Sequence, residues 1–398
     1  MIKNVTIGDL GTIITGNTPP RNKPELYGDH TPFIKATDIS ESEKHTYFPE
    51  EKYSKEGYEK YRSSLIPQGA TCVVTIGSIG KKMTMAHCDC FINQAMNAIV
   101  PNNDFDSEYV YYAVKNIIGN LKSLDSGTAS GRENVSKSAF SKMSICIETD
   151  KEKQIKIGKI LSAYDDFIEN NQKQIKLLEE AAQRLYKEWF VDLRFPGHED
   201  VEVVDGVPEG WKKHRLITLS SVLKRGISPA YSDDGKYTVI SQKCIRQSIM
   251  DINESRKQTK CYHIDLNLCD SDTVICSTGA GTLGRVGQVF GEYPNTTFDS
   301  HVTLVRPENF PNYVYQAIKA QQDYLMGMGR GSTNQQELYR GVIENMMILL
   351  PSTAMLEQAE RMFSSIHNKV SYINKQIRLL IEARDRLLPK LMSGEMEV

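Results

Sequence analysis

The chain has 398 residues, of which 40% are apolar and 25% are charged, a composition typical of soluble globular proteins. This length allows two or more domains, each with its own core. The formal net charge of −2 excludes the strong basic excess of a protein that grips DNA alone through its phosphates. If the chain binds nucleic acid, its positive surface must be local or shared with a partner.

The N-terminal residues lack the basic-then-apolar layout of a signal peptide, and no run reaches the roughly 18–20 apolar residues of a membrane span. The eight cysteines are scattered. The closest pair, Cys88 and Cys90, has no second pair at zinc-finger spacing. We therefore expect reduced, structural thiols, no metal site, no membrane partner and a cytoplasmic protein.

The predicted elements follow one order in each half of the chain. Short β-branched runs separated by turn residues come first and are typical of strands and loops. "EYVYYAVKNIIGNL" (Glu108 to Leu121) then predicts a helix, "KMSICIE" a strand, and the residues that follow a helix of more than thirty residues. The second half repeats this order with "NYVYQAIKAQQDYL" (Asn312 to Leu325), "NMMILLP" and a second long helix. The sequence therefore predicts a tandem duplication.

The two long helices carry the closest internal match. "KQIKLLEEAAQRL" (Lys173 to Leu185) returns as "KQIRLLIEARDRL" (Lys375 to Leu387), with nine of thirteen positions identical at an offset of 202. Apolar residues recur in alternating steps of four and three, the spacing of a coiled coil. The residues predicted to form this seam are Leu161, Ile168, Ile175, Leu178 and Leu185 in the first helix, and Phe363, Val370, Ile377, Leu380 and Leu387 in the second.

Thirty-three such residues form a rod of about 50 Å, longer than the core of a domain of this size needs. We therefore favour pairing of the two helices, and antiparallel pairing is the simpler geometry because a whole globular domain separates them. The alternative is that each helix packs only on its own domain. The expected fold class is mixed α/β (α+β), with two duplicated globular domains separated by two long helices paired as an antiparallel coiled coil. The predicted boundaries are a first globular domain at 1–150, a helical region at 151–194, a second globular domain at 195–350 with a connector at 195–210, and a helical region at 351–398.

These features together resemble the specificity subunit of type I restriction–modification systems over essentially the whole chain. The resemblance rests on the connector "WFVDLRFPG" followed by "DGVPEGW", the opening "IGDLGTIITGNTPP", the "GSIGK" turn, and long helices entered through "EKQIKIGKIL" and "LEQAERMF". The family usually has a tryptophan near "TPFIKATDI", where this chain has Phe33.

The resemblance implies a non-catalytic chain whose globular domains are two target-recognition domains, each reading half of a bipartite, asymmetric DNA sequence. It implies three partners: double-stranded DNA, two copies of a methyltransferase (modification) subunit, and restriction (motor nuclease) subunits. S-adenosylmethionine, ATP and magnesium are then expected on the partner subunits, with no cofactor on this chain. Two readers at a set separation suit two half-sites, and a duplicated helix pair suits two equivalent docking events.

Base recognition needs hydrogen-bonding side chains on loops that reach the groove edges. The candidates in the first domain are Arg21, Lys35, Thr37, Ser78, Lys81, Lys82, Ser130 and Arg132. The candidates in the second domain are Gln242, Lys243, Arg246, Thr278, Arg285, Arg330, Ser332, Thr333 and Asn334. For any one of them the alternative is an ordinary solvated loop residue.

Two rival functions stay open at this stage: a stand-alone nuclease or methyltransferase with its own recognition domains, and a structural adaptor with coiled-coil arms. Gly279 to Gly284 fits a dinucleotide-binding fingerprint, but the residues after it read as strand and turn instead of the required helix. Glu50-Glu51-Lys52 contains the E-x-K of metal-dependent nucleases, in a charged loop where such a match occurs by chance. We therefore predict no catalytic residue.

Overall fold

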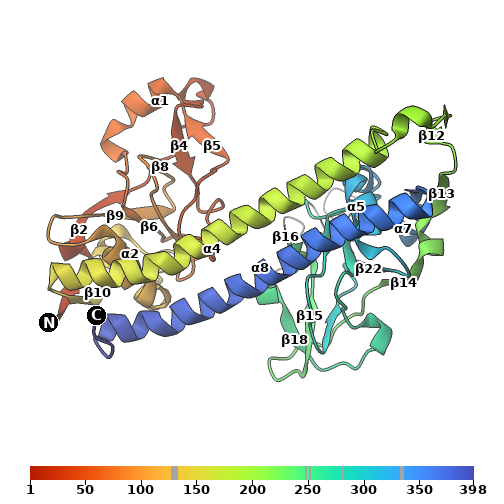
Figure 1. The fold of residues 1–398 in the computed structure, drawn as a ribbon. Coiled ribbons are helices and arrows are strands. Elements are labelled where there is room, and N and C mark those ends of the chain that lie inside the picture. Colours follow the sequence, from red (N-terminus) through yellow and green to blue (C-terminus); the bar gives the residue numbers. More distant parts are fainter. Residues whose placement is uncertain (127–132, 247–248, 251, 280, 332–335) are drawn as a thin grey trace. The chain divides into compact units, whose positions relative to one another are not determined.

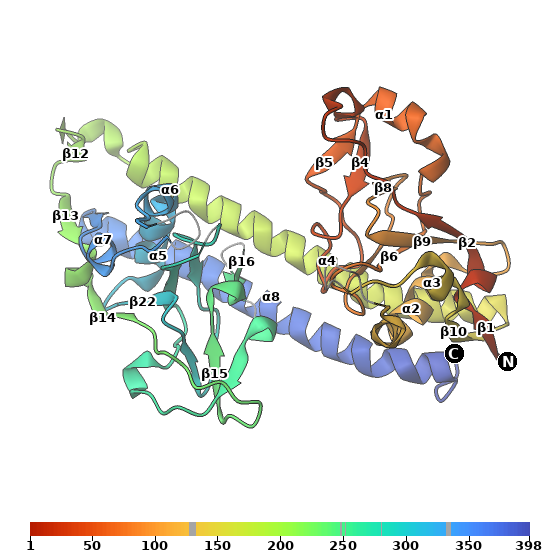
Figure 2. The same cartoon turned by 180° about the vertical axis from the view of Figure 1, so that it is seen from behind.

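The computed structural model describes residues 1–126, 133–246, 249–250, 252–279, 281–331 and 336–398. These residues form two compact units, and each unit is discontinuous in sequence. Unit 1 comprises Met1–Gln172 and Gln376–Val398, and unit 2 comprises Lys173–Lys375. Figures 1 and 2 show the course of the chain through both.

Unit 1 contains three small sheets. Its strands are β1 (Ile2–Thr6), β2 (Gly11–Thr15), β3 (Tyr27–Gly28), β4 (Thr31–Ile34), β5 (Glu51–Tyr53), β6 (Thr71–Val74), β7 (Met83–Met85), β8 (Phe91–Ile92), β9 (Met96–Pro101) and β10 (Ser144–Glu148). They pair in the orders β1-β10, β2-β9-β6-β7 and β3-β5-β4-β8. Its helices are α1 (Lys55–Lys60), α2 (Ser107–Ile117) and α3 (Lys137–Lys142).

Unit 2 repeats this plan. Its strands are β11 (Val203–Val204), β12 (Val207–Pro208), β13 (Lys212–Arg215), β14 (Ser220–Arg225), β15 (Tyr237–Ile240), β16 (Ile245–Arg246), β17 (Ile249–Met250), β18 (Arg256–Gln258), β19 (Thr273–Cys276), β20 (Val286–Gln288), β21 (Thr296–Phe298), β22 (Val302–Pro307) and β23 (Met347–Leu350). Its helices are α5 (Pro311–Ala320), α6 (Gln322–Gly327) and α7 (Arg340–Glu344).

The sheets of the two units correspond strand by strand. The pair β1-β10 matches β13-β23, and β2-β9-β6-β7 matches β14-β22-β19-β20 within the larger sheet of unit 2. The parallel pair β4-β8 matches the parallel pair β15-β21. Two stretches with this order of pairing in one chain are the structural record of the predicted duplication. The predicted fold class, mixed α/β with two long helices, is confirmed.

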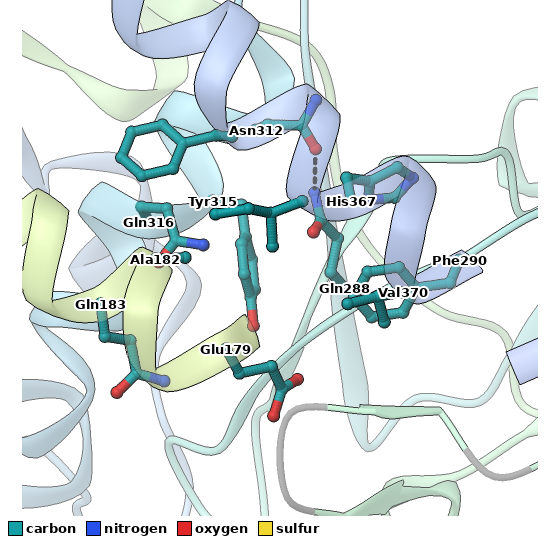
Figure 3. Close-up of a pocket in the computed structure, with 12 residues that line it drawn as sticks. Glu179, Ala182, Gln183, Gln288, Phe290, Asn312, Tyr315, Gln316, His367 and Val370 are labelled. Carbon is teal, nitrogen blue, oxygen red and sulfur yellow. Dashed lines mark hydrogen bonds between the residues drawn. The ribbon is translucent and has the colours of Figure 1, made fainter. Parts of the chain in front are cut away.

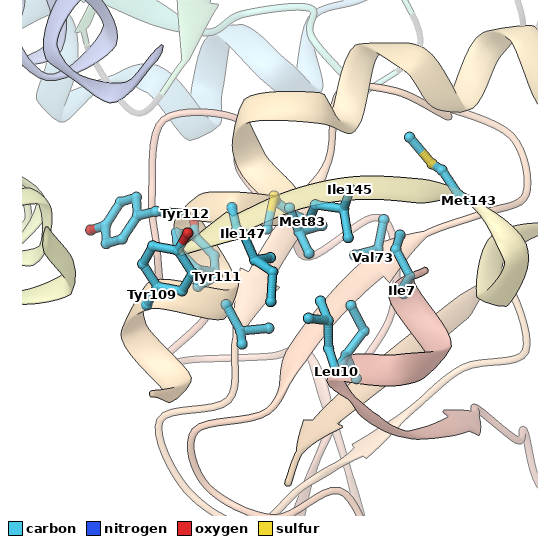
Figure 4. Packing of buried hydrophobic residues seen from close by; sticks show 14 of the residues in the cluster. Ile7, Leu10, Val73, Met83, Tyr109, Tyr111, Tyr112, Met143, Ile145 and Ile147 are labelled. Atoms are coloured by element: carbon cyan, nitrogen blue, oxygen red, sulfur yellow. The ribbon is translucent and has the colours of Figure 1, made fainter. Parts of the chain in front are cut away.

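The core of unit 1 forms where α2 packs on the sheets (Figure 4). The Asp106 side chain caps α2 by accepting a hydrogen bond from the Tyr109 backbone N–H at 2.9 Å, and residues 109–114 of this helix are all buried. The Tyr109 hydroxyl in turn accepts the backbone N–H of Glu148 at 2.6 Å, which ties α2 to β10. In unit 2, the Tyr313 hydroxyl of α5 donates to the Leu349 carbonyl at 2.5 Å, an equivalent tie to β23.

Two long helices, α4 (Lys151–Tyr186) and α8 (Thr353–Ser393), each contribute one segment to each unit. In unit 1, Ile157 and Leu161 near the start of α4 share a core with Leu388 and Leu391 near the end of α8. In unit 2, the end of α4 shares a core with Phe363 near the start of α8. The helices therefore pair antiparallel within each unit.

The predicted seam residues divide by burial. Leu161, Ile168, Ile175, Phe363 and Val370 are buried, and Leu178, Leu185, Ile377, Leu380 and Leu387 are partly exposed. Where a helix also packs against its globular lobe, the buried residue is the one that follows the predicted seam position. Tyr186 and Leu388 are therefore buried, and the adjacent seam residues Leu185 and Leu387 are half-exposed. A further turn of π-helix, Lys187–Val191, extends α4 and buries Phe190.

Candidate nucleic-acid interface

Three loops of unit 1 meet beside the sheet β2-β9-β6-β7. The first is the turn after β4, the second joins β6 to β7, and the third precedes α3. Lys82 of the second loop donates from Nζ to the Ala36 carbonyl of the first at 3.3 Å. The Gly77 N–H donates to the Glu133 carbonyl of the third loop at 2.9 Å. Hydrogen bonds between loops hold the three together, so they present one surface.

The first loop is a tight turn that exposes Thr37. The Lys35 N–H donates to the Asp38 carboxylate at 2.8 Å, and the Asp38 N–H donates back to the Lys35 carbonyl at 2.9 Å. Burial raises the pKa of Asp38 above its usual value. Ser78 and Lys81 are exposed on the second loop, where Gly77 and Gly80 adopt φ values of 91° and 74° that L-residues rarely take.

The equivalent three loops meet in unit 2. The Leu338 N–H of the third loop donates to the Ser277 carbonyl of the second at 2.8 Å, and Thr278 bridges to Glu337. Thr278 Oγ1 donates to Gln242 Oε1 of the first loop at 3.1 Å. The duplication has therefore preserved a junction of three loops while its side chains diverged.

Gln242, Thr278 and His301 form a small polar cluster at this junction. Thr278 Oγ1 lies 2.6 Å from His301 Nδ1 as well as within hydrogen-bond distance of Gln242. Gly279, at φ 104°, makes this approach possible, since a Cβ there would lie 2.9 Å from Gln242 Nε2. Burial raises the pKa of Asp299, whose carboxylate accepts the His301 N–H at 2.9 Å. The side chains are thus held in place by neighbours before any ligand binds.

Arginine side chains flank the junction of unit 2. Arg285 donates from Nη2 to the Gly281 carbonyl at 2.8 Å and from Nη1 to the Ile245 carbonyl at 3.4 Å. The backbone of Arg330 exchanges hydrogen bonds of 3.0 and 2.9 Å with Glu337, while its side chain is exposed. Lys243 is exposed on the first loop. These residues place cations around the Gln242 cluster.

Arg21 and Lys35 lie in a separate, charge-balanced cluster. Arg21 makes two hydrogen bonds to the Glu51 carboxylate, at 2.9 and 3.0 Å, and its guanidinium lies 4.9 Å from the centroid of the Tyr27 ring. Lys35 pairs with Glu50, and its ammonium lies 3.2 Å from Glu51. Hydrogen bonds from Arg21 and Lys35 lower the pKa of Glu51. Neither cation is presented to solvent without a neighbouring carboxylate.

The remaining sequence candidates lie at the edge of what the structure describes. Ser130, Arg132, Ser332, Thr333 and Asn334 are outside the described residues, and only the backbone of Arg246 is described, in β16. The residues on both sides of these gaps belong to the third loop of each unit. His301 is not among the sequence candidates, yet its Nδ1 lies 2.6 Å from Thr278 Oγ1. The signal was its position just before β22 and opposite the Gly279 turn.

Buried polar contacts also fasten the globular part of unit 1 to α4. Lys44, only 1% exposed, places its ammonium 2.5 Å from the Glu108 carboxylate and donates to Ser162 Oγ at 2.9 Å. The His45 backbone N–H and the Tyr47 hydroxyl donate to Glu169 of α4 at 2.9 and 2.7 Å. The loop before β5 is therefore held against the helix by charge as well as by packing.

Two further observations bear on chemistry. The residues after the glycines at 279–284 form β20, so no helix N-terminus follows that turn to hold a phosphate. No group of three or more His, Cys, Asp or Glu side chains suited to a metal ion occurs among the described residues. Among the helices that the structure describes, none combines the length and apolar character of a bilayer crossing.

The fold and these loops define a class of protein. It is a tandemly duplicated α/β protein with one three-loop junction in each unit and two long helices that each contribute to both units. The family model of the type I restriction modification DNA specificity domain matches residues 2–180. The type I restriction enzyme MjaIX specificity subunit of Methanocaldococcus jannaschii is 25% identical and aligns with 98% of this chain and 93% of its own length. The HindI specificity subunit of Haemophilus influenzae is 30% identical over 44% of this chain and 38% of its own.

The same likeness extends to a solved fold. The crystal structure of the type I restriction–modification S subunit from M. genitalium matches with a TM-score of 0.58 at 17% identity, covering 98% of this chain and 96% of that one. Residues 2–180 therefore match the DNA specificity domain of type I restriction–modification systems, and nearly the whole chain is similar to a specificity subunit of such a system.

Proposed function

We propose that this chain reads a bipartite, asymmetric DNA sequence, with one half-site assigned to the loop junction of each unit. The observation that carries the proposal is the repetition of one three-loop frame with different side chains. Because the three loops have the same arrangement in both units, each junction would approach DNA in the same orientation. Because the side chains on the loops differ, the two junctions would recognise different bases. An asymmetric target follows.

The chemistry of the loops suits this role. In unit 2, an amide such as Gln242 pairs with adenine and a guanidinium such as Arg285 or Arg330 pairs with guanine. In unit 1, Thr37 and Ser78 offer hydroxyls to either kind of base, while Lys81 and Lys82 suit phosphates. Arg21 and Lys35 are weaker candidates, because each must leave a carboxylate partner to reach DNA.

We assign α4 and α8 the role of spacer between the two readers. Each helix supplies one segment to each unit, so their length sets how far apart the two half-sites are read. The antiparallel pairing within each unit gives this spacer two strands, which resists bending better than one. A spacer of fixed length requires the two half-sites of the target to lie a fixed distance apart. In the same way, the geometry of dimeric repressors sets the spacing of their half-sites.

We further propose that the helices dock two copies of a methyltransferase subunit, with restriction subunits joining later. The support is two groups of exposed apolar side chains on the two long helices, called patch 1 and patch 2. Patch 1, in unit 1, is Ile160, Phe167 and Leu379, and patch 2, in unit 2, is Met362, Tyr372 and Leu177, all of them exposed.

The internal repeat relates two residues of each patch, whereas Phe167 and Tyr372 correspond to Lys369 and Asn170. The 202-residue offset carries Ile160 onto Met362 and Leu177 onto Leu379. Exposed apolar groups at equivalent places are the signature of two equivalent partners. The partners would also supply phosphate contacts that a chain of net charge −2 lacks.

Catalysis is assigned to those partners, in the cytoplasm, together with S-adenosylmethionine, ATP and magnesium. The rival of a stand-alone nuclease or methyltransferase is tested by incubating the purified chain alone with S-adenosylmethionine, magnesium and plasmid. We expect neither methylation nor cleavage, and either product would reject the assignment.

The experiment that tests the proposal as a whole is methylome sequencing of cells with and without the chain. We expect a single two-part motif to lose its methylation when the chain is absent. A continuous motif, or an unchanged methylome in cells shown to express the partner methyltransferase, would contradict bipartite reading.

A further inference from the structure

A buried ion pair lies between the two long helices of unit 1. Arg384 of α8 and Asp165 of α4 are 3% and 1% exposed, and Arg384 Nη1 donates to Asp165 Oδ1. The Tyr112 hydroxyl donates to the other carboxylate oxygen at 2.6 Å, and the Lys115 ammonium lies 3.9 Å from it. Arg384 also contacts Asp385 at 2.8 Å. Both charges are compensated in a site from which water is excluded.

The equivalent place in unit 2 holds a different pair of residues. The 202-residue offset carries Arg384 onto Ala182 and Asp165 onto His367. Both line a cavity with about 20 Å³ of space for water (Figure 3). His367 directs Nε2 to Asp270 at 3.0 Å, while its Nδ1 and Gln316 Oε1 have no hydrogen-bond partner within the described part of the chain. Unit 2 therefore has neither the cation nor the volume that Arg384 supplies in unit 1.

The helix ends differ in shape as well as in charge. Leu388 and Met392 of α8 fill the core of unit 1, and the residues at the same repeat positions in α4 are Tyr186 and Phe190. In unit 2 these rings lie 5.7 and 4.9 Å from the ring of Tyr313. One unit accommodates aliphatic side chains and the other accommodates aromatic ones.

Pairing between identical halves would separate the buried charges. In a twofold pair of first-half helices, Asp165 would face Ala182 of the other copy and keep a buried carboxylate without its arginine. In a twofold pair of second-half helices, Arg384 would face His367 and lose its carboxylate. An uncompensated buried charge is strongly destabilising, and a single buried polar group can set the pairing of helices.

We propose that the Asp165–Arg384 pair is a pairing code, which makes each half of the chain accept the helix of the other half and reject a second copy of itself. The code ensures that every assembled molecule carries one reader of each kind. This inference concerns the association of the halves and does not depend on DNA binding, so its test needs no DNA.

The test uses the complete chain cut at one place. Asp205 and Gly206 form the exposed turn of the β11–β12 hairpin, where a protease site can be inserted. Cleavage of the folded protein leaves residues 1–205 and 206–398 as two fragments. After unfolding and refolding at equal concentrations, native mass spectrometry counts mixed and like pairs. Without a code the ratio of like first, mixed and like second pairs is 1:2:1; with the code, we expect mixed pairs to exceed it by about tenfold or more.

Two variants isolate the charges. D165N/R384Q removes both charges and keeps a polar side chain at each position, and we expect the excess of mixed pairs to fall by about tenfold. A182R supplies the missing cation opposite Asp165 of a second copy, and we expect like pairs of the first fragment to appear. A wild-type ratio of 1:2:1, or an excess that survives D165N/R384Q unchanged, would overturn the proposal.

A second measurement covers the case in which the fragments do not refold. In the intact chain, D165R should lower the thermal midpoint, and D165R/R384D should recover more than half of that loss. Tyr112 and Lys115 are unchanged in both variants, so the two variants differ only at residue 384. No recovery in the reversed pair would overturn the proposal.

Discussion

Arg330 combines a fixed backbone with an exposed charge. Its N–H and carbonyl both bond to Glu337, and its guanidinium lies 5.9 Å from the centroid of the Tyr339 ring. A cation held this way loses little freedom when it contacts a base or phosphate. We predict that R330A weakens binding of cognate DNA by about 1–3 kcal/mol in the reconstituted complex, measured by fluorescence anisotropy.

The matched control is R340A in the same unit. Arg340 is also exposed, but it lies on α7 in a hydrogen bond of 2.6 Å to Glu344 four residues on, and is not among the predicted readers. Removing such a surface pair costs little stability. We expect R340A to bind like the unsubstituted chain. Equal losses in both variants would show a general effect of charge and would remove Arg330 from the reading surface.

Glu179 gives a pH dependence with a definite sign. Its carboxyl lines the cavity of unit 2, and burial raises its pKa from 4.5 to about 7, an effect that Lys319 opposes. The folded state then binds more protons than the unfolded state between these values, so stability falls as pH rises from about 4.5 to 7 and levels off above. We predict that E179Q is more stable than the unsubstituted chain at pH 8, by about 1–3 kcal/mol.

Urea unfolding at a series of pH values measures this difference. The two proteins should converge near pH 4.5, because Glu179 is then protonated in the folded state and carries no charge there. An E179Q chain that is less stable at pH 8, or a difference independent of pH, would show that the Glu179 carboxylate is stabilised in place, and would refute the sign.

Single-residue prediction placed candidates on the intended loops where a loop carried its own turn chemistry, and their role in reading DNA stays a prediction. The glycines at 77 and 279 mark the second loop of each unit, and the candidates beside them, Ser78 and Thr278, lie at the loop junctions. It was weaker where a partner arrives from elsewhere in the fold. Arg21 meets Glu51 only because β5 pairs with β3 and β4, and no local pattern announces that contact.

Among the secondary-structure elements, periodicity predicted the long helices and much of their buried seam. It did not predict Tyr186 and Phe190, which are buried while the seam position Leu185 is half-exposed. A simple four-three pattern describes a helix with one buried face. These residues belong to turns that face both the partner helix and a globular core, and the π-helical turn at Lys187–Val191 adds a further shift.

The helices as spacer predict a measurable change of gap. One extra heptad at the Gln172–Lys173 junction of α4 and one at Lys375–Gln376 of α8 preserve the seam and lengthen each helix by about 10 Å. We predict that the tolerated gap between half-sites grows by about three base pairs at 3.4 Å each. Selection on targets with randomised gaps measures it. An unchanged gap in an active complex would reject the spacer role.

An insertion that breaks the seam is the contrasting variant. Four residues near Gln183 advance the helix by about 6 Å and also rotate it out of register. We expect either an altered gap or loss of assembly, while the base preference of each reader stays the same. A change in the bases read would instead implicate this region in base recognition.

At the scale of the whole molecule, the order of elements along the chain predicted only part of the domain organisation. The sequence suggested two globular domains each followed by a helix, and the strand orders of both halves agree with that duplication. It could not show that Leu388 and Leu391 complete the core of the unit that begins at Met1, since partner choice between two similar helices depends on tertiary contacts. Arg384 stands four residues after Leu380 and three before Leu387, so the alternating spacing puts a charge in line with the seam and signals a specific partner.

The two apolar patches lead to a prediction about stoichiometry. F167E in patch 1 and L177E in patch 2 each put a carboxylate into an exposed apolar surface of one unit. If each patch docks one methyltransferase subunit, either variant alone should leave one copy bound and the double variant none, because a buried unpaired charge opposes docking. Native mass spectrometry of complexes reconstituted with excess partner counts the copies.

Controls on another face of the same helices separate docking from a general effect of charge. Lys159 and Arg361 are exposed, lie next to Ile160 and Met362, and are themselves equivalent in the repeat. K159E and R361E change the charge at those positions without entering either patch, and we expect both to keep two partners. If F167E keeps two copies, or if K159E loses one as readily, the patches are not the docking surface. Loss of one copy per patch would mean that the two repeats of this chain bind two copies of the same partner at equivalent, pseudo-twofold-related sites.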